Sequence, residues 1–107
     1  MSLLFDRQLD AIAADDLEAL MTQYHDDATV IRLDRVASGP EEIRAFFADY
    51  LALRPVVEEV TAVRETTDTI LYRATMTIGG NRVTAFGTLV LRDGKIWRQT
   101  AAALPQQ

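Results

Sequence analysis

The strongest constraint on the fold is a series of four long strand-like segments that fills the second half of the chain. They read VVEEVTAVRET, TILYRATMTI, RVTAFGTLVL and KIWRQTAAAL, and they break at Thr67–Asp68, at Gly79–Gly80–Asn81 and at Asp93–Gly94. Glycine and asparagine allow the backbone conformations of tight turns, and Asp-Gly is a strong hairpin signal. Strands joined by such short turns pair antiparallel. The second half of the chain therefore predicts one meandering, curved sheet.

The first half of the chain predicts helices. Apolar residues recur at helical spacing in residues 4–14, 17–24 and 40–54. Asp15 or Asp16 can cap the second helix, and Pro40 suits the first helical position of the third. The segment ATVIRLD, residues 28–34, lies between these two helices and reads as a strand. We therefore expect an α+β fold in which three N-terminal helices cover the sheet.

Length and charge narrow the class of protein. The chain has 107 residues, which fits a single domain over residues 1–107, and it carries a net charge of −5. Binding to nucleic acid is not expected, because such proteins normally present a basic face. No apolar segment approaches the length needed to cross a membrane, and no signal peptide is recognisable. With no cysteine in the sequence, we expect a cytoplasmic protein without thiolate metal sites.

Three stretches resemble the SnoaL-like domains of the nuclear transport factor 2-like superfamily: DDLEALMTQYHDDATV, SGPEEIRAFFADYL and DGKIWRQTAAAL. Gly39, Ile43 and Arg44 match a Gly-x-x-x-Ile-Arg pattern. The resemblance covers nearly the whole chain. It implies a cone, in which a strongly curved, mainly antiparallel sheet of the cystatin-like α+β barrel type wraps around the helices and leaves a pocket at its open end. Members include polyketide cyclases, ketosteroid isomerases, dehydratases, epoxide hydrolases and binding domains, so the fold does not choose a function.

The ketosteroid isomerases are the enzymes whose catalytic residues can be laid most directly on this sequence. Their aspartate base would fall on Arg32, which cannot accept a proton. Their tyrosine would fall on Gln8, and their second acid on Gly87 or, with a shift of two, on Leu89. All three roles are vacant, so steroid isomerisation by that mechanism is not expected.

Arg32 and Asp34 are the candidate catalytic residues. They share one face of the predicted strand with Val30, and the resemblance turns that face toward the pocket. The guanidinium group of Arg32 could bind a carboxylate, phosphate or enolate oxygen, and Asp34 could pair with it or act as a base near the mouth. The alternative is that Arg32 reaches the surface from a strand end and forms an exposed ion pair.

Tyr24, Arg32, Trp97 and Gln99 are the candidate ligand contacts. The resemblance places Trp97, Gln99, Ala101 and Ala103 on the inner face of the last strand. A buried glutamine amide needs partners, which for Gln99 are a ligand or else Arg32, a tyrosine or the backbone. Tyr24 lies on an apolar face, where tyrosines and tryptophans usually belong to the core.

His25, Asp26 and Asp27 are expected to be structural. Consecutive side chains in a turn diverge, the chain has no second histidine, and a helix end leading into a turn explains the cluster. We therefore predict no metal site and no cofactor.

Two functions remain open from the sequence. The first is binding of a small, mainly apolar molecule in the pocket, with cofactor-free isomerase, cyclase, dehydratase or hydrolase chemistry if the domain is catalytic. The second is a non-catalytic module that acts through the outer face of the sheet, where Phe86 and Val90 stand among threonines and arginines. The resemblance implies a homodimer formed through that face, whereas a solvated face is the simpler alternative.

Overall fold

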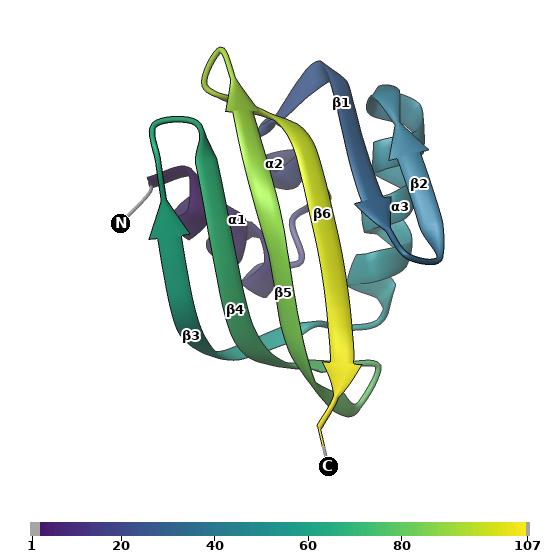
Figure 1. The fold of residues 1–107 in the computed structure, drawn as a ribbon. Coiled ribbons are helices and arrows are strands. Elements are labelled where there is room, and N and C mark those ends of the chain that lie inside the picture. The colour runs from purple at the N-terminus through teal and green to yellow at the C-terminus, as the bar shows by residue number, and fades with distance from the viewer. Residues whose placement is uncertain (1–2, 107) are drawn as a thin grey trace.

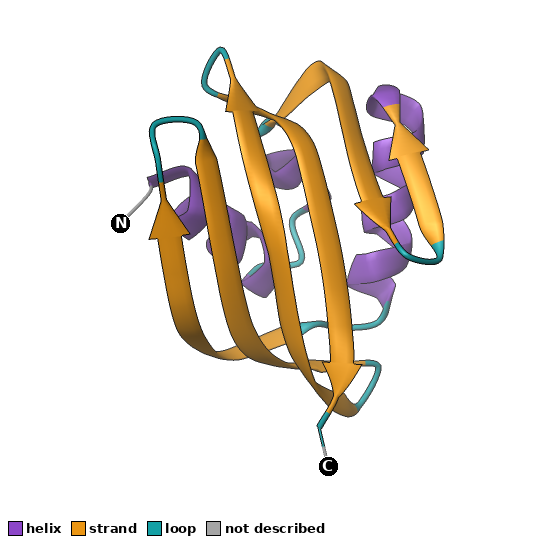
Figure 2. Ribbon diagram, viewed as in Figure 1, coloured by secondary structure: helices purple, strands orange, loops and turns teal. Residues whose placement is uncertain are grey.

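The computed structural model describes residues 3–106 and has the expected α+β architecture. The elements are, in order, α1 (Leu3–Ala13), α2 (Leu17–Met21), β1 (Tyr24–Arg32), β2 (Arg35–Ser38), α3 (Gly39–Ala52), β3 (Val56–Glu65), β4 (Thr69–Ile78), β5 (Asn81–Arg92) and β6 (Lys95–Pro105). The strands form one sheet in the order β2-β1-β6-β5-β4-β3. All three helices lie behind this sheet in Figure 1, and the sheet curves around them without closing (Figure 2).

The predicted antiparallel meander is confirmed for β3 to β6. The pairing of β4 with β5 is regular along its whole length, whereas β3 shifts register twice against β4, after Val57 and after Val60. Such bulges bend a strand and increase its twist. They therefore help to curl this edge of the sheet toward the helices.

The first strand joins the far side of the meander in a parallel arrangement. Val30 on β1 lies beside Gln99 on β6, and Arg32 lies beside Ala101. The sequence did not predict this pairing, because the two strands are separated by most of the chain. The pairing places Arg32 beside Ala101, one of the residues expected on the inner face of β6.

Two predicted boundaries in the first half were wrong. The second helix ends at Met21, and Tyr24 opens β1 instead of closing that helix. Asp16 caps the helix, since its side chain accepts a hydrogen bond from the backbone N–H of Ala19 at 3.0 Å. The predicted strand over residues 28–34 ends at Arg32, so Asp34 lies in a tight turn that leads into the short strand β2.

The expected alternation along the last strand also fails at one point. Val90 pairs with Arg98 and Leu91 pairs with Ile96, so Trp97 is an extra residue in β6 with no partner on β5. The bulge lets Ile96 and Gln99 both point inward although they are three residues apart, and their exposed fractions are 0% and 6%. Trp97 is carried away from the inner face.

The core lies between the helices and the concave face of the sheet. Its fully buried large side chains are Leu20, Val30, Ile43, Ile70, Leu89 and Ile96. The predicted inner faces of β4 and β5 are confirmed, because Ile70, Ala74, Met76, Ala85 and Leu89 are all buried. Within residues 3–106, none of the helices combines the length and the apolar character that crossing a bilayer requires.

Candidate functional site

A large hollow lies inside the cone, between the helices and the curved sheet. It has a volume of about 1000 Å³ and is bordered by α1, α3, the β1–β2 turn and strands β4 to β6. Residues from both faces of the sheet border it, so this volume includes space at the rim as well as the interior. The interior wall is mainly apolar, and its aromatic side chains are Phe5, Phe46, Phe47, Tyr50 and Tyr72. A concave apolar wall with a few polar groups is typical of small-molecule sites.

Three buried polar side chains form a hydrogen-bonded relay at the inner end of this hollow. Gln8 on α1 donates from Nε2 to the hydroxyl of Tyr24 at 2.9 Å. That hydroxyl donates in turn to Oε1 of Gln99 on β6 at 2.5 Å. Exposed fractions of 4%, 5% and 6% place all three in the interior. Gln99 points inward as predicted, and the partner of its buried amide is a tyrosine, one of the alternatives to a ligand.

Gln8 is the member of the relay that sequence reasoning missed as a site residue. It appeared only as the residue that replaces the tyrosine of the ketosteroid isomerases. A local signal was present, because Phe5, Gln8, Leu9 and Ile12 follow the i, i+3, i+4, i+7 spacing of the buried face of α1. A glutamine within an apolar stripe needs a buried partner, and here the partner is Tyr24.

Gly87 is closely covered by its neighbours. It pairs with Tyr72 on β4, and a Cβ atom at Gly87 would lie 2.8 Å from the Tyr72 hydroxyl oxygen and 2.3 Å from the carbonyl oxygen of Thr100. The phenol ring of Tyr72 therefore packs across Gly87. One of the two positions considered for the second acid of the isomerases is closed by these contacts.

The ionisable groups of the interior are tyrosines that remain protonated. Burial raises the pKa of Tyr24 well above its ordinary value and raises the pKa of Tyr72 to about 12. Burial also raises the pKa of Tyr50, whose hydroxyl lies 3.9 Å from the sulfur of Met76. At neutral pH these phenols are hydrogen-bond donors and acceptors but not bases. The interior therefore offers hydroxyl and amide groups without charge.

Arg32 and Asp34 supply the charge at the mouth of the hollow. The guanidinium of Arg32 donates from Nε to one carboxylate oxygen of Asp34 at 2.6 Å and from Nη2 to the other at 3.3 Å. It also lies over the ring of Phe46, with Cζ 4.9 Å from the ring centroid. The side chain of Asp34 is 71% exposed, and its hydrogen bond with Arg32 lowers the pKa of the carboxyl group. The pair combines the two alternatives considered for Arg32, since this half-buried arginine borders the pocket and also pairs with an exposed carboxylate.

Trp97 is not brought to this site. The bulge in β6 turns its ring toward the guanidinium groups of Arg98 and Arg92, whose Cζ atoms lie 3.8 Å and 5.1 Å from the ring centroid. Its indole N–H is buried without a hydrogen-bond partner in the described part of the chain. The contact predicted between Trp97 and a pocket ligand therefore loses its geometric basis.

His25 lies at the irregular start of β1, and the prediction that it lies at a helix end was wrong. Its Nδ1 accepts a hydrogen bond from the backbone N–H of Asp27 at 3.0 Å, and its Nε2 lies 3.6 Å from a carboxylate oxygen of Asp93. Among residues 3–106, no three histidine or acidic side chains gather as metal ligands would.

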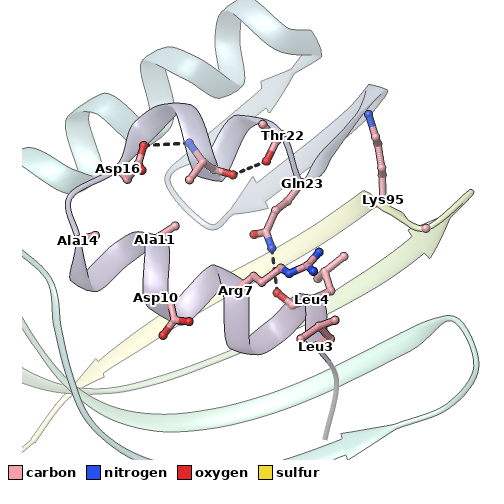
Figure 3. Close-up of a pocket in the computed structure, with 12 residues that line it drawn as sticks. Leu3, Leu4, Arg7, Asp10, Ala11, Ala14, Asp16, Thr22, Gln23 and Lys95 are labelled. Atoms are coloured by element: carbon pink, nitrogen blue, oxygen red, sulfur yellow. Dashed lines mark hydrogen bonds between the residues drawn. The ribbon is translucent and has the colours of Figure 1, made fainter.

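A second, shallower hollow of about 610 Å³ lies where α1 and α2 approach the β5–β6 turn (Figure 3). Gln23 is its buried polar residue, and Nε2 of this side chain donates to the carbonyl of Leu4 at 2.9 Å. Charged side chains of both signs border it: Arg7, Asp10, Asp16 and Lys95. An apolar molecule would have to desolvate those charges, so the cone is the better candidate for a ligand site.

Comparison with known proteins places this arrangement in a family. Among solved structures, a candidate polyketide cyclase from Sinorhizobium meliloti is 25% identical, with a TM-score of 0.82 and coverage of 95% of each chain. A candidate ketosteroid isomerase from Kribbella flavida is 16% identical, with a TM-score of 0.83 over 97% of this chain and 77% of the other. A protein of ketosteroid isomerase-like fold from Catenulispora acidiphila, in complex with trimethylamine, is 19% identical, with a TM-score of 0.80 over 95% of this chain and 85% of the other.

A search of curated proteins finds no match to the sequence. The model of the SnoaL-like domain family matches residues 5–99, a range that begins within α1, ends within β6 and contains all three members of the relay. The chain therefore belongs to the SnoaL-like domain family.

Proposed function

We propose that this protein binds a small, mainly apolar, uncharged molecule inside the cone. The observation that carries the proposal is the combination of an apolar concave wall with inner polar groups that are all amides or protonated phenols. A charged ligand group would lose its hydration there without meeting an opposite charge. The trimethylamine bound to the Catenulispora acidiphila protein supports small-molecule binding by a domain of this fold.

Any catalysis in this pocket falls to Arg32 and Asp34 at its mouth. The carboxylate of Asp34 is a weak base, because its hydrogen bond with Arg32 lowers its pKa. Arg32 can donate to an oxygen that gains negative charge, since its fork keeps donors free beyond the two bonds to Asp34. This pair supports cofactor-free proton transfer, as in an isomerase, cyclase, dehydratase or hydrolase, only for a readily ionised substrate. Binding is therefore the better supported function.

Calorimetric titration with naphthalene and coumarin tests the binding proposal. Ala101→Leu places extra volume on the inner face of β6 beside Gly87, and it should weaken binding of both probes at least about fivefold. Ala102→Leu is the matched control, because it adds the same side chain one residue later on the outer face, opposite Phe86. Absence of binding to the unmodified protein, or equal effects of the two substitutions, would contradict an interior site.

Self-association through the outer face of the sheet is a second function that a specific observation favours. Cross-strand pairing aligns one row across five strands, consisting of Leu71, Thr88, Thr100, Ile31 and Val36. The apolar members of this row are 45% to 60% exposed, and Phe86 beside it is 38% exposed. An apolar row of this kind suits an isologous contact with a second copy of the chain.

Light scattering after size-exclusion chromatography tests this second function. The unmodified protein should elute as a dimer, and Leu71→Lys with Ile31→Lys should elute as a monomer with unchanged circular dichroism. A protein that stays monomeric across a hundredfold range of concentration, about 1 to 100 μM, would remove the homodimer from consideration, because stable interfaces persist at the lower end of that range.

A further inference from the structure

The relay of Gln8, Tyr24 and Gln99 leaves part of its hydrogen-bonding capacity unused. A glutamine amide has two N–H donors and an oxygen that accepts, yet Gln8 contributes only one N–H to the relay and Gln99 contributes only its oxygen. Within the described residues, Oε1 of Gln8 and Nε2 of Gln99 have no hydrogen-bond partner. Neither atom is fully enclosed, and both residues line the hollow. Both side chains border the cone, so these free groups are available to a molecule inside it.

The relay can run in either direction with the same result. The hydroxyl of Tyr24 is both donor and acceptor, and turning both amides by 180° reverses each bond without moving a heavy atom of the tyrosine. In one direction Gln8 offers a free carbonyl oxygen and Gln99 a free NH₂ group. In the other direction the two residues exchange these roles. In either direction of the relay, the wall therefore presents one acceptor and one donor, one from each glutamine.

We propose that this relay selects uncharged ligands that carry a hydrogen-bond donor next to an acceptor, such as a lactam or another carboxamide. The inference rests on the proposed binding function and adds the chemical class of the ligand. A ligand with only an acceptor would leave the amide oxygen of the wall unpaired, and a hydrocarbon would leave both groups unpaired. A carboxylate would bring a charge into an interior where the described groups are neutral. The relay should therefore bind a neutral ligand with a donor and an acceptor more tightly than an acceptor-only ligand, a hydrocarbon or a carboxylate.

Four probes of similar size separate these alternatives. The lactam 2-quinolinone carries N–H beside a carbonyl, and coumarin replaces that N–H by a ring oxygen with almost the same shape. Naphthalene has neither polar group, and 2-naphthoate carries a charge. In calorimetric titrations of the unmodified protein, 2-quinolinone should bind about fivefold to tenfold more tightly than coumarin, as expected for one buried hydrogen bond. Naphthalene should bind more weakly than coumarin, and 2-naphthoate weakest of the four.

Substitution of the glutamines assigns the preference to the relay. Gln8→Met and Gln99→Met keep similar volume but remove the amide groups, so each should reduce the preference for 2-quinolinone over coumarin to within about twofold. Gln23→Met is the matched control, because Gln23 is also a buried glutamine but borders the other hollow. This control should keep the full preference even where it lowers stability.

The outcomes distinguish failure of this inference from failure of the binding function. If the unmodified protein binds none of the four probes, both the binding function and the selection are wrong. If it binds naphthalene and coumarin but binds 2-quinolinone no more tightly than coumarin, the binding function stands and the selection is overturned. Tightest binding of 2-naphthoate would overturn both the selection and the proposal that the ligand is uncharged. A preference that survives in both Gln8→Met and Gln99→Met also overturns it. The comparison of probes needs only the unmodified protein, so it holds even if a variant does not fold.

Discussion

Replacing Tyr24 by phenylalanine tests how much the relay contributes to the folded state. The substitution keeps the aromatic ring, whose centroid lies 5.2 Å from that of Phe47, and removes only the hydroxyl group. Two bonds are lost together, one from Nε2 of Gln8 and one to Oε1 of Gln99. The effect therefore measures the two interior hydrogen bonds with little change in packing.

The expected magnitude follows from the two amides left without their partner. Each buried polar group that loses its hydrogen bond costs about 1–3 kcal/mol. Water that enters the hollow can reach the two amides, and the variant no longer desolvates a hydroxyl, so the total should lie near the lower bound, at about 2–3 kcal/mol. With an unfolding entropy of about 2.1 cal/mol/K per residue, this loss lowers the Tm of the 107-residue chain by about 9–13 °C.

Tyr50→Phe provides the matched control. Tyr50 belongs to the same cluster of buried phenols, but among residues 3–106 its hydroxyl has a single hydrogen-bond partner, the weakly accepting sulfur of Met76 at 3.9 Å. Its removal should cost less than about 1 kcal/mol. Urea denaturation followed by the fluorescence of Trp97, the single tryptophan, measures both variants. Equal losses in Tyr24→Phe and Tyr50→Phe would refute the relay as a source of stability.

A double-mutant cycle adds a second check on the relay. Gln8→Met should cost at least about 1 kcal/mol less in the Tyr24→Phe background than in the unmodified protein, because the bond between these residues is then already absent. Costs that simply add would show that the two side chains contribute independently, contrary to the geometry.

Three further predictions concern the rest of the site. Gly87→Ala places its Cβ atom 2.3 Å from the carbonyl oxygen of Thr100, so the backbone of β6 must move. We expect the free energy of unfolding, measured by urea denaturation, to fall by about 1–3 kcal/mol, and a decrease below about 0.5 kcal/mol would contradict the close packing. Arg32→Ala should weaken coumarin binding by about twofold to tenfold in calorimetry. The free energy of unfolding should change by less than about 1 kcal/mol, because the carboxylate that loses its partner, that of Asp34, is 71% exposed to water. Loss of stability with unchanged binding would argue against the place of Arg32 at the mouth. Burial raises the pKa of Tyr72 to about 12, above the value of about 10 in an unfolded chain. The folded state therefore holds this proton more tightly between those values, and stability should fall with rising pH there by about 1.4 kcal/mol per pH unit for this residue; Tyr72→Phe should flatten the decline by that amount in denaturation curves at pH 10–12.

The fold was predictable where a repeated local pattern determines it. Strands β4 and β5 have an apolar residue at every second position and are joined by a glycine turn, so both their pairing and their inner faces were predicted correctly. Strand β2 was missed because its four residues are too few to establish a period. The boundary at Tyr24 was misplaced because this residue continues the helical spacing from Leu17 as well as it begins a strand.

The site was less predictable because its contacts are not local. The members of the relay are separated by 16 and 75 residues along the chain. The parallel pairing of β1 with β6, which brings Tyr24 and Gln99 together, leaves no mark on either segment alone. The orientation of Trp97 was predicted wrongly for a local reason. A single extra residue in β6 reverses the alternation on which that prediction depended.

The residues at the three positions that hold the catalytic groups of the ketosteroid isomerases have one property in common in the folded chain. At the position of the base, Arg32 pairs with Asp34 outside the interior; at the position of the tyrosine, Gln8 bonds to a different tyrosine, Tyr24. At the first position considered for the second acid, Gly87 is covered by the ring of Tyr72. Each change removes an acid or a direct donor and replaces it with a neutral or externally paired group. Because an interior of this kind cannot take a proton from carbon, whereas it can hold a polar, uncharged molecule by paired hydrogen bonds, the same three changes that exclude the isomerase mechanism favour a selective binding site.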